Sequence, residues 1–127
     1  MEKYALNPDP KKSVKVSGRG LRISTKNSAV VCRAISGMNF TKGRRLLSDF
    51  VSEKQNLGGK HYTNISSTLL DLLDSAKNNA EFKGMEPEKM IIHASAHKGF
   101  RFFRNRRFKM RRQKRKITNI QMILLAK

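Results

Sequence analysis

Residues 101–116, with the sequence RFFRNRRFKMRRQKRK, limit what this chain can fold into more than any other segment. Ten of the sixteen positions are Lys or Arg and none is acidic, while three phenylalanines and a methionine lie among them. A hydrophobic core cannot accommodate so many unpaired charges of one sign. The aromatic residues, in turn, are unusual for a solvated tail. The segment needs a surrounding that supplies both negative charge and apolar contacts.

The charge of the whole chain is divided unequally along its length. The 127 residues carry a formal net charge of +19; residues 1–88 contribute +6 (15 basic, 9 acidic), and residues 89–127 contribute +13 (13 basic, none acidic). A chain of this length forms one domain with a modest core. Because neutralised phosphates release condensed counterions, the surplus favours a polyanionic partner, which is a nucleic acid, an anionic membrane surface or an acidic protein.

Local patterns predict three helices and three strands outside the basic stretch. Residues 1–12 form an irregular arm because Pro8 and Pro10 block regular structure. Strands are predicted over residues 13–24, with a bend or bulge near Gly18 and Gly20, and over 89–97 and 117–126. The first helix is predicted from Ser24 or Thr25 to Gly37, the second from Thr41 to a stop before Gly58, and the third from Asn64 to Lys83. Residues of these helices that are predicted to face the core include Val30, Val31, Leu47, Phe50, Val51, Leu69 and Leu73.

The basic stretch could adopt one of three structures. A disordered tail is disfavoured because predicted strands flank the stretch, and a membrane-active helix because basic residues surround it on all sides. An antiparallel hairpin that bends near Asn105–Phe108 is favoured, with arms of about ten residues that reach on the order of 30 Å. Its like charges should repel, so it should be ordered only among phosphates. Structured RNA supplies both phosphates and exposed bases, which favours RNA over duplex DNA.

No pattern predicts catalysis, a cofactor or a metal site. His93 and His97 lie four residues, or about 13 Å, apart on a predicted strand, which is too far for one metal ion. Asp71 and Asp74 fit a solvated helix face, and Cys32, surrounded by apolar residues, fits a buried core position. No apolar run approaches the length of a membrane span and the N-terminus lacks a signal-type apolar region, which predicts a soluble, cytosolic protein.

Several segments resemble those of a known family, the universal protein of the large ribosomal subunit that is numbered twenty-two in bacteria and seventeen in eukaryotes. They are TKNSAVVCRAISGMNFTKGRRLL at residues 25–47, SAKNNAEFKGM at 75–85, YALNPDP at 4–10 and IQMILL at 120–125. The resemblance extends over nearly the whole chain. It implies an α+β fold in which three helices pack on a small antiparallel sheet, with a long basic β-hairpin. Residues 1–12 would be the arm, 13–97 and 117–127 the body, and 98–116 the hairpin.

The resemblance also implies a function without catalysis. The body would lie near the outer end of the nascent-chain exit tunnel, and the hairpin would form part of the tunnel wall. Ribosomal RNA, neighbouring ribosomal proteins and the nascent polypeptide would be the partners. The tip that faces the tunnel would be Asn105, Arg106, Arg107 and Phe108. The residues implied to bind RNA are Lys11, Lys12, Lys15, Arg19, Arg22 and Lys26 in the body and Lys98, Arg101, Arg104, Arg106, Arg107, Lys109, Arg111, Arg112, Lys114, Arg115 and Lys116 in the hairpin.

The chain departs from the family pattern in three places. Ala29 and Ser36 stand where members usually carry basic residues, the loop QNLGGKHYTN at residues 55–64 is shorter than in eukaryotic members, and the hairpin lacks the Gly-Arg near the tip and is a few residues shorter. A free RNA- or DNA-binding protein that acts off the ribosome remains the alternative, and a cationic membrane-active protein is a further one.

Overall fold

The computed structural model describes residues 3–104 and 108–126. In chain order the elements are β1 (Ser13–Leu21), α1 (Thr25–Ile35), α2 (Phe40–Val51), α3 (Thr63–Phe82), the short 3-10 helix η1 (Pro87–Lys89), β2 (Met90–Lys98), β3 (Phe102–Phe103), the 3-10 helix η2 (Phe108–Met110), β4 (Lys114–Arg115) and β5 (Thr118–Ala126).

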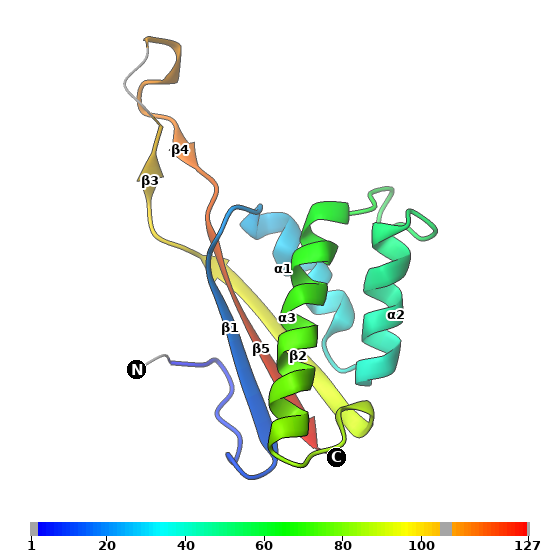
Figure 1. Cartoon of the computed structure of the whole chain (residues 1–127). Coiled ribbons are helices and arrows are strands. Elements are labelled where there is room, and N and C mark those ends of the chain that lie inside the picture. The colour runs from blue at the N-terminus through cyan, green and yellow to red at the C-terminus, as the bar shows by residue number, and fades with distance from the viewer. Residues whose placement is uncertain (1–2, 105–107, 127) are drawn as a thin grey trace.

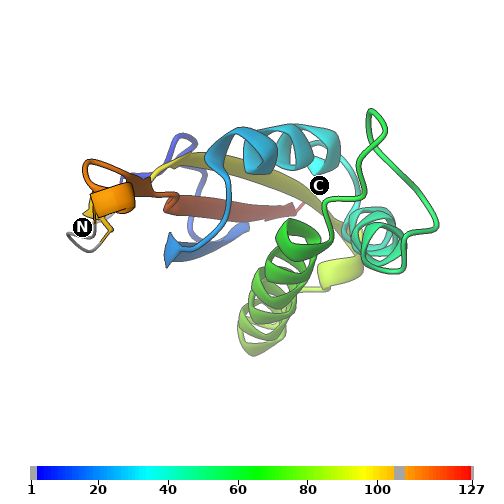
Figure 2. The same ribbon diagram turned by 90° about the horizontal axis from the view of Figure 1, so that it is seen from above.

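The body is a three-stranded sheet with helices packed on one of its faces. The strand order is β1-β5-β2 and both pairings are antiparallel, so β5 occupies the centre. Because side chains alternate along a strand, the even-numbered residues of the strands face the helices, and Val14, Ile92, Met122 and Leu124 are fully buried there. Helix α1 packs against β2 and α3 against β1, while α2 packs on α3 (Figures 1 and 2). The predicted α+β fold is confirmed.

The helical core differs from the prediction at two valines. Val30 and Val51 were expected to face the core, but their exposed fractions are 38% and 40%. Helix α2 begins at Phe40, one residue earlier than predicted, and buries Phe40 and Gly43 with Leu47 and Phe50. A Cβ at position 43 would lie 2.5 Å from Cδ1 of Ile92, so the absent side chain brings α2 close to β2.

The outer edge of β2 is covered by the turn that follows α1. The amide of Gly37 donates to the carbonyl of Ile92 at 2.8 Å, and the amide of Ile92 donates to the carbonyl of Met38 at 2.9 Å. The hydroxyl of Ser36 lies 3.0 Å from both the amide and the carbonyl of Ala94. The strand edge therefore has partners within the chain, which removes a template for pairing with a second molecule.

The N-terminal arm is held against the face of the sheet that the helices leave open. The side-chain amide of Gln121, on the central strand, donates to the carbonyl of Lys3 at 2.8 Å and accepts from the amide of Ala5 at 3.4 Å. The Lys15 ammonium lies 5.4 Å from the centre of the Tyr4 ring. These contacts combine a cation–π interaction with main-chain hydrogen bonds, so the arm is ordered without being helix or strand.

The hairpin projects from the end of the sheet where β2 ends and β5 begins (Figure 1). Lys98 pairs with Thr118, but the next pairs are Phe102 with Arg115 and Phe103 with Lys114. Three residues of one arm thus face two of the other, which is a bulge. Each paired position joins a phenylalanine to a cation, so no two like charges lie directly opposite each other there.

Regular strand structure in the hairpin is shorter than the ten residues per arm that the sequence suggested. Strands β3 and β4 have two residues each, and the Arg104 amide donates to the Gln113 carbonyl at 2.9 Å just beyond them. On the return arm η2 comes before Gln113 in the chain. Met110 therefore belongs to a 3-10 turn and not to a strand face. Of the predicted bend, residues 105–107 lie outside the described residues.

The thiol of Cys32 is expected to be inert in the folded protein. Burial raises its pKa from 9.0 to about 12, so the folded state retains the proton where the unfolded chain loses it. Stability should therefore fall as the pH rises from about 9 towards 12. Near neutral pH, iodoacetamide should modify the native protein about 100-fold more slowly than the urea-unfolded chain, as followed by mass spectrometry. Equal rates in the two states would contradict the buried placement.

Candidate nucleic-acid interface

The charge of the molecule is divided between two sets of elements. Residues 40–89, which include α2, α3 and η1, contain 8 basic and 7 acidic groups, a net charge of +1. The other 77 residues contain 20 basic and 2 acidic groups, a net charge of +18. The sequence had indicated an excess of positive charge in residues 89–127. Because the remaining excess lies in residues 1–39, β1 and α1 are also part of the strongly basic region. A polyanion is attracted to β1, α1 and the hairpin, and much less to α2 and α3.

Ion pairs on the near-neutral part neutralise much of its positive charge. Arg44 on α2 lies 3.0 Å from Asp74 on α3, and Lys77 lies 3.6 Å from Glu81 one helical turn later. Exposed pairs of this kind contribute little to stability. The hairpin, in contrast, lies in the stretch of residues 89–127 that has no acidic residue, so its cations are available to an external anion.

Most of the implied RNA-binding residues are exposed. In the hairpin, Lys98, Arg101, Arg104, Lys109, Arg111, Arg112, Lys114 and Lys116 are exposed and Arg115 is half-buried; in the body, Lys11, Lys12, Arg19, Arg22 and Lys26 are exposed and Lys15 is half-buried. Asn105, Arg106 and Arg107 lie outside the described residues, and Phe108 begins η2. The described cations are therefore accessible to an external anion on the hairpin, on β1 and at the start of α1.

Aromatic rings accompany these cations along the hairpin. The Arg115 guanidinium lies 5.3 Å from the centre of the Phe102 ring, and the Lys114 ammonium lies 5.9 Å from that of Phe103. Because Phe102 and Phe103 are adjacent on a strand, each face of the hairpin carries one ring with one cation. Cations and rings in alternation can contact both the phosphates and the bases of an RNA chain.

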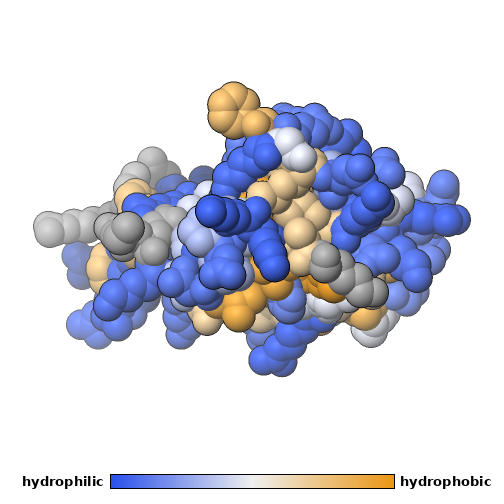
Figure 3. Space-filling view, turned by 90° about the horizontal axis from the view of Figure 1, so that it is seen from below, coloured by the Kyte–Doolittle hydropathy of each residue, from blue (hydrophilic) through white to orange (hydrophobic). Residues whose placement is uncertain are grey.

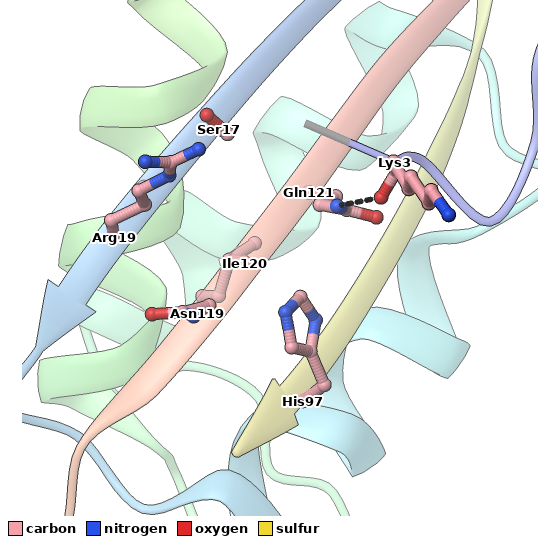
Figure 4. A pocket seen from close by; sticks show the side chains of 8 residues that line it. Lys3, Ser17, Arg19, His97, Asn119, Ile120 and Gln121 are labelled. Carbon is pink, nitrogen blue, oxygen red and sulfur yellow. Dashed lines mark hydrogen bonds between the residues drawn. The ribbon is translucent and has the colours of Figure 1, made fainter. Parts of the chain in front are cut away.

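A second group of polar residues lies on the open face of the sheet. Arg19, His97, Asn119 and Gln121 project from three neighbouring strands, with Lys3 of the arm beside them (Figure 4). They line a cleft of about 320 Å³. Asn119 accepts a hydrogen bond from the Gly20 amide at 2.9 Å, and this bond lies where the pairing of β1 with β5 shifts in register between Gly18 and Leu21. The cleft presents hydrogen-bonding groups and cations, and none of its lining residues is acidic.

The residues considered for metal binding do not come together. His93 and His97 pair with Ile123 and Asn119 on β5 and remain four residues apart on one strand. Over residues 3–104 and 108–126, no three His, Cys, Asp or Glu residues are placed to hold one metal ion. In the same ranges, no helix combines the length and the apolar character that crossing a bilayer requires.

The end of the body remote from the hairpin carries both hydrophilic and hydrophobic residues on its surface (Figure 3). Hydrophilic residues cover most of it, and hydrophobic atoms lie between them. Phe82, the last residue of α3, has an exposed fraction of 94%, the largest among the large hydrophobic side chains of residues 3–104 and 109–126. The helical period is consistent with this exposure, because Phe82 lies two residues, or about 200° of helical rotation, from the buried Ala80.

Two groups that shape the interface were missed in the sequence. Thr118 is fully buried, and its hydroxyl donates to the carbonyl of Ile23 at 2.8 Å and lies 2.8 Å from the hydroxyl of Thr25. For Asn119 the sequence predicted only a place in a strand, and not the hydrogen bond that its side chain accepts from the Gly20 amide. A polar pair, Thr-Asn, at the start of an otherwise apolar strand was the available signal, because buried polar groups require specific partners.

The fold and the charge distribution define an α+β protein whose positive charge is concentrated outside residues 40–89. Comparison with known sequences specifies the family. Residues 16–124 match the family described as Ribosomal protein L22p/L17e, and the chain belongs to that family.

Several relatives carry the name Large ribosomal subunit protein uL22. The relative from Methanococcus aeolicus is 35% identical, over 76% of each chain. The one from Methanococcoides burtonii is 36% identical, also over 76% of each chain, and the one from Thermofilum pendens is 31% identical over 78% of each chain. The predicted family resemblance is confirmed.

Proposed function

We propose that the protein is a structural constituent of the large ribosomal subunit in the cytoplasm, that it binds ribosomal RNA and that it catalyses no reaction. Membership of the L22p/L17e family carries this proposal, together with relatives that are named as large-subunit proteins. The division of charge supports it independently, since a net +18 outside residues 40–89 needs a dense polyanion as partner.

In this arrangement the two cationic regions have different tasks. The body surface over β1 and the start of α1 binds RNA phosphates and sets the position of the protein. The hairpin reaches further into the RNA and contributes to the wall of the nascent-peptide exit tunnel, with Asn105–Phe108 nearest to the nascent chain. The near-neutral side with α2 and α3 is left for neighbouring ribosomal proteins.

Removal of the hairpin tests its task. A variant in which a short glycine–serine link replaces residues 101–114 retains every residue of the buried core cluster. We expect it to be folded by circular dichroism, to enter large subunits poorly, and to leave an altered tunnel wall in density maps of the particles that contain it. Full incorporation with an unchanged tunnel wall would exclude the hairpin role.

Sedimentation separates the proposed function from that of an RNA- or DNA-binding protein acting off the ribosome. The tagged full-length chain should co-migrate with large subunits through a gradient at moderate salt. A variant with the same tag but lacking residues 101–114 is the matched sample. A wild-type chain that remains in the light fractions would favour the free binding protein.

A further inference from the structure

A cleft lies at the base of the hairpin, where the start of α1 meets the two arms. Its volume is about 380 Å³, within the range of about 300–1,000 Å³ that is typical of sites enclosing small ligands. Six of its lining residues are basic, namely Lys26, Lys98, Arg101, Lys114, Arg115 and Lys116, and none is acidic. The cleft also contains one aromatic ring, that of Phe100. Cations surrounding a single ring match a ligand with a phosphate and a planar base.

The walls of this hairpin-base cleft are held by buried contacts. The hydroxyls of Thr25 and Thr118 lie 2.8 Å apart, and Thr118 also donates to the carbonyl of Ile23, so the start of α1 is joined to the start of β5. The amide of Gly99 donates to the carbonyl of Ile117 at 2.9 Å. A Cβ at position 99 would lie 2.6 Å from Ile117 Cγ2. The cleft is therefore organised before any ligand enters, which lowers the entropic cost of binding.

Contacts on two sides hold the Phe100 ring in place and leave much of it open. The ring meets Phe102 edge to face, with centres 6.5 Å apart and planes at 77°. Its Cε1 atom would lie 3.3 Å from a Cβ at Gly20, whose φ of +68° also disfavours any side chain. Even so, the exposed fraction of Phe100 is 62%, although bulged strands and the first turn of α1 surround it. An oriented, accessible ring beside cations is suited to stacking on a base.

We propose that the hairpin-base cleft binds one unpaired nucleotide of an RNA chain, with its base stacked on Phe100 and its phosphate contacted by Lys26, Lys98 or Lys116. This inference rests on the proposed RNA-binding function and specifies the ligand at one point of that surface. Bases in a duplex are stacked between their neighbours, so only an extruded base presents a face to a ring inside a cleft.

The rest of the strand has a path away from the cleft. A neighbouring cleft of about 410 Å³ shares Ser24 and Lys116 as lining residues and is lined further by Arg22, Lys60 and Tyr62. The two clefts adjoin at the start of α1. An unpaired segment can therefore pass from Phe100 across Lys116 into the second cleft, where further cations meet its backbone.

Binding of the full-length chain to two RNAs tests the proposal. The probes are a short single-stranded RNA and the duplex formed by the same strand, measured by fluorescence anisotropy at equal salt. Phe100→Leu removes the aromatic face and retains apolar volume. We expect it to weaken binding of the single strand about 10-fold, which corresponds to the loss of one base–aromatic stack, while binding of the duplex changes less than about twofold.

Phe82→Leu is the matched control, because Phe82 is an exposed ring on the near-neutral side, and it should leave both affinities unchanged. The midpoint of thermal unfolding of each variant must equal that of the wild type. Equal effects of Phe100→Leu on both RNAs, or none, would overturn the proposal. So would full displacement of the single strand by adenosine monophosphate, which would assign the cleft to free nucleotides.

The outcome is separable from that of the proposed function. If Phe100→Leu binds both RNAs like the wild type while the chain still co-sediments with large subunits, the cleft is wrongly assigned and the ribosomal role stands. If the wild-type chain does not enter large subunits, the ribosomal role fails whatever the cleft binds.

Discussion

Replacing Arg101, Arg104, Lys109 and Arg111 together by Gln should lower the affinity of the protein for large-subunit RNA by about 1,000-fold. All four side chains are exposed and lie in a segment without acidic residues. Loss of four charge-assisted phosphate contacts, at roughly 1 kcal/mol each, gives this figure. The slope of log K against log salt should become less steep by about 3 units, since each neutralised phosphate contributes about 0.7–0.9. Filter binding over a salt series measures both quantities.

The control for this variant carries the same change in net charge at different places. Lys42, Arg45, Lys54 and Lys89 are exposed cations of residues 40–89, and their joint replacement by Gln should lower the affinity less than about 10-fold. If the two variants lose affinity equally, net charge alone governs binding, and the hairpin has no special part in it. The comparison thus separates a localised interface from general attraction.

Leu73→Ala should reduce the free energy of unfolding by about 2–5 kcal/mol. Leu73 lies on α3, is fully buried, and belongs to the cluster that joins the helices to the sheet. Truncation removes apolar contacts and leaves a cavity, because close-packed neighbours relax only partly. Urea unfolding followed by circular dichroism gives the difference directly.

Val51→Ala is the companion substitution. Val51 ends α2 with an exposed fraction of 40%, so its truncation should cost less than about 1 kcal/mol. A loss of stability as large as that of Leu73→Ala would mean that the end of α2 is packed against a part of the chain that the fold does not place there.

Elements with a strong period could be predicted from the sequence. The third helix was expected over residues 64–83 and spans Thr63–Phe82, because Leu69, Leu73 and Ala76 recur at helical spacing. The second helix was harder to predict, because glycine has a low helix propensity and Gly43 lies inside the helix. The absence of a side chain at Gly43 leaves room for the side chain of Ile92. That contact depends on a residue almost fifty positions away, so no local pattern reveals it.

Only part of the candidate interface could be predicted from the sequence. Its basic residues can be read from the sequence directly, and most were named there as expected RNA contacts. The hairpin-base cleft was not predicted, because it lies where the pairing of the two arms shifts by one residue between Lys98–Thr118 and Phe102–Arg115, and the sequence analysis did not place this shift. The like-sign charges on both arms gave a reason to expect weak pairing, and the short β3 and β4 agree with that reason.

The central position of β5 has a consequence for how the protein is made. Strands β1 and β2 both pair with β5, and Gln121 on β5 also anchors the N-terminal arm. During translation, neither outer strand has its neighbour until residues 118–126 have been synthesised. The sheet thus assembles late. Until then the emerging chain exposes the apolar residues that will form the core, a state that favours aggregation.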